Sequence, residues 1–582
     1  MNWRWFARNL AAGIAALAVF PLNAQDRQPE SGDGRAEKAS VSAESFMVAA
    51  AHPLAARAGY HVLKQGGTAA DAAVAVQLVL NLVEPQSSGI GGGTFLLYWD
   101  AAARRLTSYD GRETAPAAAT PSYFLKENGS PKGFWEAVVG GGSVGVPGTL
   151  RLLEAVHGKH GRLAWADLIQ PAITLAEDGF EVTPRMANSI ARAKVWSLDK
   201  YPAARAYFFD AEGAPRQAGD LLKNPAFAET LREVATGGAD AFYEGEIAAD
   251  IVAAVRATAD NPGVLTLQDL ADYGVKERDP LCLPYRVYRV CGMGPPSSGG
   301  LTVGQMLGIL NHFDMPGIGP GPDAAHLLAE AGKLAFADRA LYMADSDFVR
   351  MPTAGLLDPA YLMLRAQAVD RDGAMEQARP GNPPWKDAAR RSPDHSPDRP
   401  GTSHVVIRDR YGNAASMTAS IETGFGSRVM VRGFLLNNEL TDFSRVPEVD
   451  GRPVANRVEG GKRPRSSMAP TIVFGPDGEP FLLIGSPGGS RIINYVAQTI
   501  VGVLDWKMDI QEAISAGHVV NRNGATDLEK GTEAEAFAGA LESMGHEVQV
   551  RDLNSGLHGI VIEAGRLTGG ADPRREGIVL GD

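Results

Sequence analysis

The segment from residue 400 to residue 421 reads PGTSHVVIRDRYGNAASMTASI. Residues 402–409 and 414–421 are two runs of mostly apolar, β-branched and small side chains, and the turn-forming sequence Arg-Tyr-Gly-Asn separates them. Such a pattern predicts a β-hairpin with a tight turn at residues 410–413. Because the hairpin begins at Thr402, the sequence predicts a threonine held in place by the start of a strand.

The residues before this hairpin have a different composition. Residues 379–400 contain six prolines and many charged side chains, and Trp385 is their only Phe, Tyr or Trp. A segment of this kind cannot bury enough apolar surface to offset the entropy lost on ordering. We therefore predict a flexible linker over residues 379–400, ahead of Gly401.

The peptide bond between Gly401 and Thr402 is a candidate site of chemistry. A threonine hydroxyl is a weak nucleophile until a base removes its proton. A free α-amino group, with a pKa of about 8, can be that base when threonine is the first residue of a chain. This mechanism requires the peptide bond after Gly401 to break, and glycine leaves that bond unhindered. Taken alone, however, the dipeptide is more often the plain start of a strand.

A second candidate is the pair Gly488 and Gly489, which precedes an apolar helix predicted over residues 491–506. Consecutive glycines at a helix N-terminus expose backbone N–H groups at the positive end of the helix dipole. That arrangement suits the negative oxygen that develops when an acyl group is attacked. A tight turn between a strand and a helix explains the same residues equally well.

Five further side chains suit a small molecule that carries both a carboxylate and an ammonium group. Arg112 follows a predicted strand and turn, and an arginine can bind a carboxylate through two hydrogen bonds. Ser466 and Ser467 follow a cationic segment, and their hydroxyls suit the same carboxylate. Glu439 and Asp442 could hold the ammonium. Each residue, considered singly, is more often a hydrated surface group.

The remaining chain changes type along its length. A helix that starts at residues 68–71 is almost wholly apolar through Val83, which indicates a buried helical layer. Residues 149–375 are mainly helical in pattern, whereas strands dominate after residue 402. Further strands are predicted at residues 433–436, 471–474 and 481–485. This order predicts two helical layers over stacked sheets.

Composition narrows the class of function. The net charge is −12 over 582 residues and no Lys/Arg run occurs, which argues against nucleic acids and anionic membranes as partners. The eleven histidines are scattered, and neither HExxH nor paired CxxC occurs, so we predict no metal and no cofactor. Cys282 and Cys291 are compatible with a disulfide and with two buried thiols.

The first 24 residues have the pattern of a signal peptide. Arg4 and Arg8 precede an apolar stretch at residues 10–22, and a small-residue cleavage site follows at residues 22–24. The apolar stretch is shorter than the roughly 20 residues that span a bilayer. We predict export to the periplasm or beyond, with no membrane insertion after signal removal. The alternative is an uncleaved anchor.

Taken together, these segments resemble the γ-glutamyltransferase (glutathione hydrolase) family of N-terminal-nucleophile hydrolases, from about Met47 to about Arg574. Any one segment is a weak indication, but their shared order is specific. They are Gly66-Gly67-Thr68-Ala69-Ala70-Asp71-Ala72-Ala73, Gly91-Gly92-Gly93, Asp110-Gly111-Arg112-Glu113, residues 295–300, Gly401-Thr402-Ser403-His404, Leu436-Asn437-Asn438-Glu439, Asp442-Phe443, Arg463-Pro464-Arg465-Ser466-Ser467-Met468, and Gly485-Ser486-Pro487-Gly488-Gly489-Ser490-Arg491.

The resemblance implies a fold and a division of the chain. The fold would be α+β, an αββα four-layer sandwich of the N-terminal-nucleophile hydrolase type, made as one precursor and processed into two chains. Residues 25–401 would be the large subunit, with the linker at its end, and residues 402–582 the small catalytic subunit. The two would remain a heterodimer.

The resemblance also implies catalytic roles. Thr402 would be the nucleophile, first in self-cleavage and then in catalysis, and Gly488 and Gly489 would form the oxyanion hole. The donor would be glutathione or another γ-glutamyl compound. The acyl group on Thr402 would pass to water, or to the amine of an amino acid or dipeptide.

The binding roles follow the two charges of a glutamyl group. Its α-carboxylate would be held by Arg112, Ser466 and Ser467. Its α-ammonium would be held by Glu439 and Asp442.

Three positions depart from the family pattern. Ser420 stands where threonine is usual, which keeps a catalytic O–H donor. Glu422 stands where asparagine is usual. If Glu422 also lines the site, a third carboxylate there would favour an aminated acyl group over a glutaryl one. Residues 445–461 form a shorter lid without tyrosine, which predicts a more open cleft and a larger share of hydrolysis.

Two rival functions remain at the level of sequence. One is a β-lactam side-chain (glutaryl/cephalosporin) acylase of the same fold, which the charge of Glu422 disfavours. The other is a secreted solute-binding protein that never cleaves itself.

Overall fold

The computed structural model describes residues 32, 34–386, 390–394, 396 and 401–582. The predicted signal peptide, residues 1–24, lies outside these residues. Among the helices in the described residues, none is long and apolar enough to cross a membrane.

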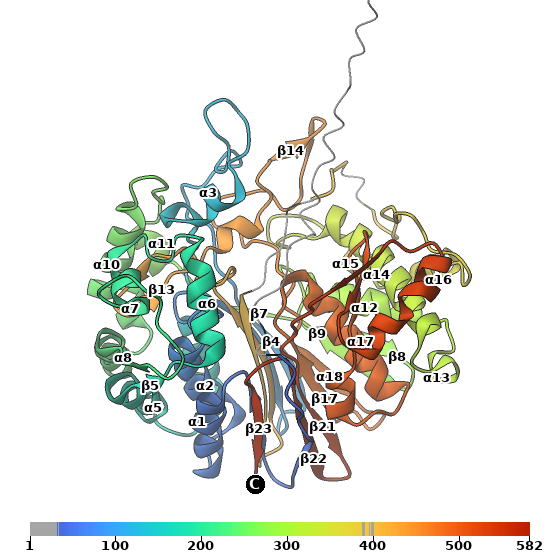
Figure 1. Cartoon of the computed structure of the whole chain (residues 1–582), viewed down its shortest axis with the longest axis horizontal. Coiled ribbons are helices and arrows are strands. Elements are labelled where there is room, and N and C mark those ends of the chain that lie inside the picture. The colour runs from blue at the N-terminus through green and yellow to red at the C-terminus, as the bar shows by residue number, and fades with distance from the viewer. Residues whose placement is uncertain (1–31, 33, 387–389, 395, 397–400) are drawn as a thin grey trace, which may run out of the picture.

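Two seven-stranded sheets, each antiparallel throughout, lie face to face in the middle of the molecule (Figure 1). The first sheet contains, in spatial order, β23 (Ile578–Gly581), β2 (Met47–Ala50), β10 (Thr402–Arg408), β11 (Ala414–Ser420), β3 (Gly93–Asp100), β4 (Arg105–Gly111) and β7 (Lys276–Arg278). The second contains β1 (Val41–Ala43), β22 (Arg566–Ala571), β21 (His558–Glu563), β17 (Pro480–Gly485), β16 (Thr471–Phe474), β9 (Tyr288–Gly292) and β8 (Leu281–Tyr285).

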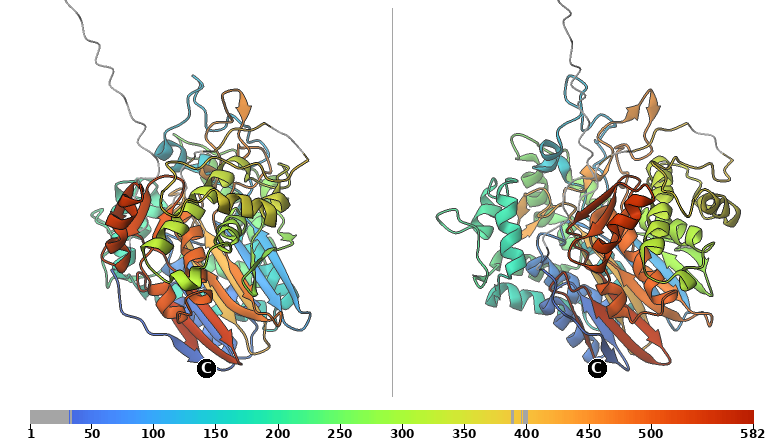
Figure 2. Two further views of the ribbon diagram at one scale, coloured as in Figure 1. Left: turned by 90° about the vertical axis from the view of Figure 1, so that its right-hand side faces the viewer. Right: turned by 45° about the vertical axis from the view of Figure 1, so that its right-hand side comes forward.

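Helices cover the outer face of each sheet. The first helical layer is built around α1 (Pro53–Lys64), α2 (Ala69–Val83), α4 (Thr149–His160), α5 (Trp165–Asp178) and α8 (Pro225–Gly237). The second is built around α12 (Gly299–Leu310), α14 (Pro322–Tyr342), α17 (Ile492–Leu504) and α18 (Ile510–Ser515). Figure 2, in its left view, shows this second layer in front of the sheets. The four layers confirm the predicted αββα sandwich.

Apolar cores on both faces of the first sheet hold the layers together. Val405 and Ile407 of β10 pack with α1 and α2 in the core under the first helical layer. Val406, between them in sequence, packs with Ile472 and Leu483 of the second sheet. Because side chains alternate along a strand, every second residue of β10 faces the space between the sheets. Thr402 therefore points into that space.

The predicted buried helix is α2, in which every residue is buried. Its first turn is closed by a capping box, because Thr68 Oγ1 accepts from the Asp71 amide and the Asp71 carboxylate accepts from the Thr68 amide. The helix ends before Glu84 and Pro85, since proline cannot continue the hydrogen-bond ladder. An all-round apolar helix is thus buried against the first sheet, as its sequence predicts.

The predicted hairpin is formed by β10 and β11, with Thr402 opposite Ser420 and Arg408 opposite Ala414. Its turn is stabilised by Asp409, whose carboxylate accepts from the amides of Tyr411 and Asn413. Gly412 adopts a φ of 85°, a conformation that disfavours side chains with a Cβ. Turn chemistry therefore fixes the register that places Thr402 beside Ser420.

The predicted helical region contains most of the remaining helices. They are α6 (Pro184–Lys194), α7 (Pro202–Phe208), α9 (Asp240–Tyr243), α10 (Gly245–Arg256), α11 (Leu267–Ala271), α13 (Met315–Ile318), α15 (Thr353–Leu356) and α16 (Pro359–Gln367). The strands predicted near residues 433, 471 and 481 are present as β13 (Phe434–Leu435), β16 and β17. The helix predicted at 491–506 is α17, preceded by a 3-10 turn at Gly489–Arg491.

The sequence left the state of the two cysteines open, and the structure joins them. Cys282 of β8 and Cys291 of β9 are cross-strand neighbours and form a disulfide. The bond lies at the edge of the second sheet.

The described part of residues 379–400 makes more contacts than its composition predicts. Gly381 donates its amide to Asp338 and accepts from the Tyr342 hydroxyl. Asp394 and Ser392 are buried against residues 449–465. The difference arises because charged and polar side chains here find specific buried partners, which compositional reasoning does not see.

Candidate active site

One cavity brings together almost all the predicted site residues. It is lined by Arg112, Thr402, Ser420, Glu422, Glu439, Asp442, Ser466, Ser467, Met468, Gly489 and Ile492. Gly488, the other predicted residue, directly precedes Gly489. These residues come from the end of β4, the β10–β11 hairpin, the 3-10 turn η3 (Glu439–Asp442), the segment before β16 and the start of α17.

Thr402 and Ser420 surround the carbonyl group of Gly401. Thr402 is 4% exposed, and its Oγ1 lies 3.5 Å from Ser420 Oγ. Ser420 Oγ donates to the Gly401 carbonyl oxygen at 2.8 Å and accepts from the Glu422 amide at 2.8 Å. Ser420 thereby polarises the carbonyl of the bond that the sequence predicts to break. The arrangement suits attack by the neighbouring threonine hydroxyl.

Gly401 has no room for a side chain. A Cβ at this position would lie 1.8 Å from the Glu422 carbonyl oxygen. The close approach of residues 401 and 422 keeps the Gly401–Thr402 bond beside Ser420.

Ser403 faces the opposite side of the sheet from Thr402. Its hydroxyl donates to Glu84 at the end of α2, and Glu84 forms a buried ion pair with Arg185. This chain of polar contacts holds the start of strand β10 against the helical layer. No local sequence pattern predicts this contact, because Glu84 and Arg185 are distant from residue 403 along the chain.

Gly488 and Gly489 have φ angles of 135° and 60°. Both lie in the region that favours glycine, and a Cβ on Gly488 would contact the Tyr495 ring at 2.8 Å. The turn they form leads through Gly489–Arg491 into α17, so the positive end of this helix faces the cavity. Bare backbone at this point is what an oxyanion site requires.

Arg112 is fully buried and contacts the acidic side chains of the cavity. Its guanidinium forms ion pairs with Glu439 and Asp442. It also donates to the backbone carbonyls of Pro464 and Arg465, each at 3.2 Å. Burial alone would lower the pKa of Arg112, but the adjacent carboxylates raise it. The cation suited to a carboxylate is therefore paired with carboxylates suited to an ammonium.

Burial raises the pKa of two carboxyl groups beside Arg112. Desolvation raises the pKa of Glu439 to about 8, against the opposing effect of Arg112. Glu113, beside Arg112, has its pKa raised to about 7 by the same cause. The carboxylates of Glu422, Glu439 and Asp442 offer oxygens within 4.8 Å of one another. The third carboxylate that the sequence placed conditionally in the site, Glu422, is therefore in the cavity.

Ser467 has a cationic neighbour that sequence reasoning missed. Arg339 of α14 donates from Nη2 to Ser467 Oγ at 2.7 Å and from Nε to Ser298 Oγ at 2.8 Å. An arginine inside a helix that is otherwise buried is the signal that could have identified it.

A second missed residue is Asp394, which precedes the predicted cleavage point. Its carboxylate forms a buried ion pair with Arg465 at 3.1 Å and accepts from Asn456 Nδ2 at 3.0 Å. Burial opposes ionisation, but Arg465 and these hydrogen bonds leave the pKa of Asp394 below its usual value. Asp394 therefore holds Arg465, the residue that precedes Ser466, in place.

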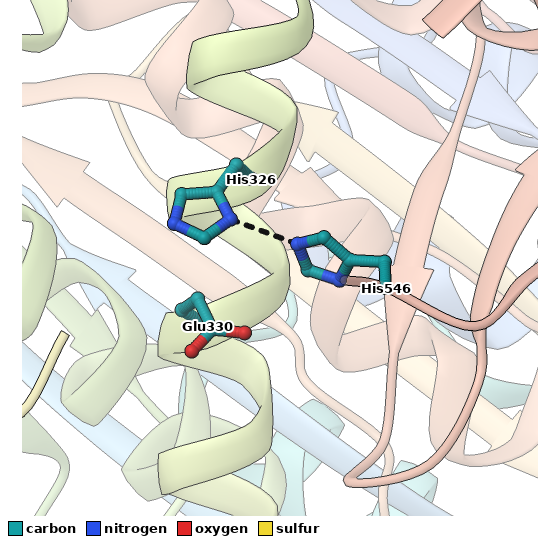
Figure 3. A group of neighbouring side chains, drawn as sticks. All are labelled: His326, Glu330 and His546. Atoms are coloured by element: carbon teal, nitrogen blue, oxygen red, sulfur yellow. Dashed lines mark hydrogen bonds between the residues drawn. The ribbon is translucent and has the colours of Figure 1, made fainter. Parts of the chain in front are cut away.

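His326, Glu330 and His546 form a buried cluster outside this cavity (Figure 3). His326 Nδ1 and His546 Nε2 are hydrogen-bonded at 2.8 Å, and His326 Nε2 donates to the Asp370 carbonyl at 2.7 Å. Glu330 is ion-paired with Lys333 at 2.9 Å. The facing nitrogens already share a proton and an ammonium lies close by, so we interpret the cluster as a packing contact of α14.

The chain is similar in sequence and in fold to known proteins. The sequence model described as Gamma-glutamyltranspeptidase matches residues 55–581. The glutathione hydrolase proenzyme of Bacillus subtilis (strain 168) is 38% identical, over 100% of this chain and 98% of the relative. The acylase ACY 1 proenzyme of Pseudomonas sp. (strain SE83) is 37% identical, over 96% and 97%.

Among solved structures, a cephalosporin acylase from Bacillus halodurans superposes with a TM-score of 0.82 at 28% identity, covering 95% of this chain and 99% of that one. Family match, full-length identity and fold agree with the sequence resemblance. The chain belongs to the gamma-glutamyltranspeptidase family.

Proposed function

We propose that this protein is a γ-glutamyltransferase and glutathione hydrolase that matures by cutting its own chain between Gly401 and Thr402. The observation that carries the proposal is the shared cavity of Thr402, Arg112 and three carboxylates. A nucleophile at Thr402 would lie beside groups that match both charges of an amino-acid moiety. Family membership and the full-length likeness to glutathione hydrolase proenzymes support the same activity.

Self-cleavage begins with Thr402 Oγ1 attacking the carbonyl carbon of Gly401. Ser420 Oγ is already hydrogen-bonded to the carbonyl oxygen and stabilises the charge that develops there. The C–N bond then breaks, the amide nitrogen takes up a proton, and an ester links Gly401 to the Thr402 side chain. That step frees the α-amine of Thr402, and water then hydrolyses the ester, which frees the carboxylate of Gly401 and the hydroxyl of Thr402.

The same threonine then acts on the donor. Its free amine removes the hydroxyl proton, and Oγ1 attacks the γ-carbonyl of the donor. The amides of Gly488 and Gly489 bind the resulting oxyanion, and the leaving amine departs with the proton. The γ-glutamyl ester on Thr402 is released by water or by the amine of an amino acid or peptide.

Donor binding exchanges one set of ion pairs for another. The α-carboxylate of the donor replaces Glu439 and Asp442 as partners of Arg112, and it also accepts hydrogen bonds from Ser466 and Ser467. The α-ammonium of the donor then pairs with these two acidic side chains. A glutaryl donor lacks the ammonium, so it brings no positive charge to Glu422, Glu439 and Asp442. This charge balance favours γ-glutamyl donors over the substrates of cephalosporin acylases.

A glutaryl-cephalosporin acylase is the second candidate, and the likeness to acylase proteins in sequence and fold is the observation in its favour. The two are separated by rates on γ-glutamyl and glutaryl anilides. We expect the γ-glutamyl anilide to react faster than the glutaryl anilide. Glu422→Gln should lower the ratio of these two rates, because it removes one negative charge that would attract the ammonium of the γ-glutamyl donor. A faster glutaryl reaction in the unsubstituted enzyme would reverse the assignment.

Maturation is tested on a denaturing gel and by N-terminal sequencing. We expect two fragments, the smaller beginning at Thr402, and a single uncleaved, inactive chain for Thr402→Ala. Processing of that variant, or a different first residue, would show that another group is the nucleophile. We also propose export through residues 1–24, and sequencing of the larger fragment from culture tests that part separately.

A further inference from the structure

Arg339 connects the large subunit to the predicted carboxylate site. It lies in α14, is 5% exposed, and donates hydrogen bonds to the hydroxyls of both Ser467 and Ser298. Ser467 itself is 8% exposed and lines the cavity. A charged donor in this low-dielectric setting forms a stronger hydrogen bond than a neutral one.

Ser298 extends the contact to the neighbouring serine. Its hydroxyl donates to the Ser466 carbonyl oxygen at 2.6 Å, and its amide donates to the same oxygen at 2.8 Å. Arg339 therefore supports both Ser466 and Ser467. It contacts Ser467 through the side chain and Ser466 through Ser298 and the backbone.

The hydrogen bond from Arg339 decides the direction of the Ser467 hydroxyl. A guanidinium is only a donor, so Ser467 Oγ must accept from it and has its own proton left to donate. Among the described residues, no hydrogen-bond acceptor for that proton is found, and the hydroxyl lines the cavity. A carboxylate, which only accepts when ionised, is the ligand that this O–H fits.

The geometry points to Arg339 as a positioning residue for the donor: it fixes Ser467 so that its hydroxyl donates to the α-carboxylate of the γ-glutamyl group. This inference rests on the proposed function. Arg339 acts through Ser467 and need not touch the donor.

The test is a double-mutant cycle on processed enzyme, with γ-glutamyl p-nitroanilide as donor. Arg339→Met and Ser467→Ala should each lower kcat/KM about tenfold or more, as expected for the loss of a charge-assisted hydrogen bond. The loss should appear mainly in KM. The double variant should be no worse than Ser467→Ala alone, because Arg339 acts through that hydroxyl. If the two losses multiply instead, the inference is overturned.

Two comparisons separate positioning from general damage. Lys333→Gln removes another buried cation of α14 that lies outside the cavity, and it should leave kcat/KM within about twofold of the unsubstituted enzyme. A 4-aminobutyryl anilide, which lacks the α-carboxylate, should react equally fast with and without Arg339→Met. A loss on this donor as large as that on the γ-glutamyl donor would contradict the role.

Processing is checked first on a denaturing gel. If Arg339→Met remains one chain, the same cycle is run with Arg339→Lys, which keeps a cation but loses the planar fork that reaches both hydroxyls. If the unsubstituted enzyme does not cleave the γ-glutamyl anilide at all, the proposed function fails. If it does and the cycle shows no coupling, only the role of Arg339 fails.

Discussion

In the proposed self-cleavage, Ser420 is the residue with the most direct role after Thr402. It donates to the carbonyl oxygen of Gly401 at 2.8 Å before any bond is broken. We expect Ser420→Ala to slow precursor cleavage about 10²- to 10³-fold, the usual cost of removing one oxyanion donor. The measurement is the rate at which freshly made precursor becomes two fragments. Ser420→Thr keeps the hydroxyl and serves as the control; Ser420→Ala cleaving as fast as Ser420→Thr would exclude this role.

The ionisation of Glu439, a second single residue, should make kcat/KM depend on pH. Burial raises the pKa of Glu439 to about 8 against the opposing effect of Arg112, so as the pH falls below that value a growing fraction of Glu439 takes up a proton that must leave before the carboxylate can pair with Arg112 or with an ammonium. We expect kcat/KM for a γ-glutamyl donor to rise with pH through about 8. The Thr402 amine, with a pKa of about 8, adds a second rise for every donor.

The two effects are distinguished by donor. A γ-glutamyl anilide requires both deprotonations, whereas a glutaryl anilide requires only that of the amine. The logarithm of kcat/KM should therefore rise more steeply for the γ-glutamyl donor below pH 8, and Glu439→Gln should remove the difference. Identical slopes for the two donors in the unsubstituted enzyme would refute this assignment of Glu439.

At the scale of elements, residues 390–394 of the predicted large subunit lie beside the lid segment. Residues 390–394 run along the lid segment, where Ser392 forms a β-bridge with Val454 next to the short strands β14 (Glu448–Val449) and β15 (Arg452–Pro453). Asp394 anchors this contact through Arg465. Figure 1 places β14 at the top of the molecule, between the two helical layers.

The Asp394 anchor gives a prediction about stability and binding together. Asp394→Ala leaves the Arg465 guanidinium buried, with Nε and Nη1 already lacking hydrogen bonds among the described residues. Removing one partner of a buried ion pair costs about 3–5 kcal/mol. We expect a lower thermal midpoint and a higher donor KM, because Arg465 adjoins Ser466. Glu376→Gln, at an exposed position of the same subunit, is the control. An unchanged midpoint and KM in Asp394→Ala would show that the anchor is dispensable.

At the scale of the whole molecule, cleavage does not separate the chain into two folded bodies. The first sheet interleaves β10, β11 and β23 of the predicted small subunit with β2, β3, β4 and β7 of the large one. The second sheet mixes the two in the same way, and apolar side chains of both fill the core between the sheets. Separation would expose edge strands and core surface at once.

We therefore expect the two fragments to co-elute as one heterodimer in gel filtration without denaturant. They should separate only when the fold is lost, and each fragment alone should be insoluble or unfolded. Recovery of a soluble, folded small fragment by mild salt or dilution would contradict this interleaved architecture.

Much of the fold could be predicted from local sequence. The β10–β11 hairpin follows from alternating runs around a Gly-Asn turn, and α2 follows from a capping box before an apolar stretch. These features depend on neighbours within a few residues, where turn chemistry and periodicity act directly. The order of strands in the sheets depends on contacts between distant residues, and no local pattern encodes it.

The site shows the same division. Sequence order and resemblance identified Thr402, Ser420 and the residues suited to a glutamyl group, while the cavity that joins them is a property of the folded chain. Arg339 and Asp394 were missed because their partners, Ser467 and Arg465, lie 128 and 71 residues away. The sequence by itself determined which chemical groups are present and which short elements carry them. Only the tertiary structure decided the partners of the buried charges, because burial leaves each charge stable only beside a group that the fold brings from elsewhere.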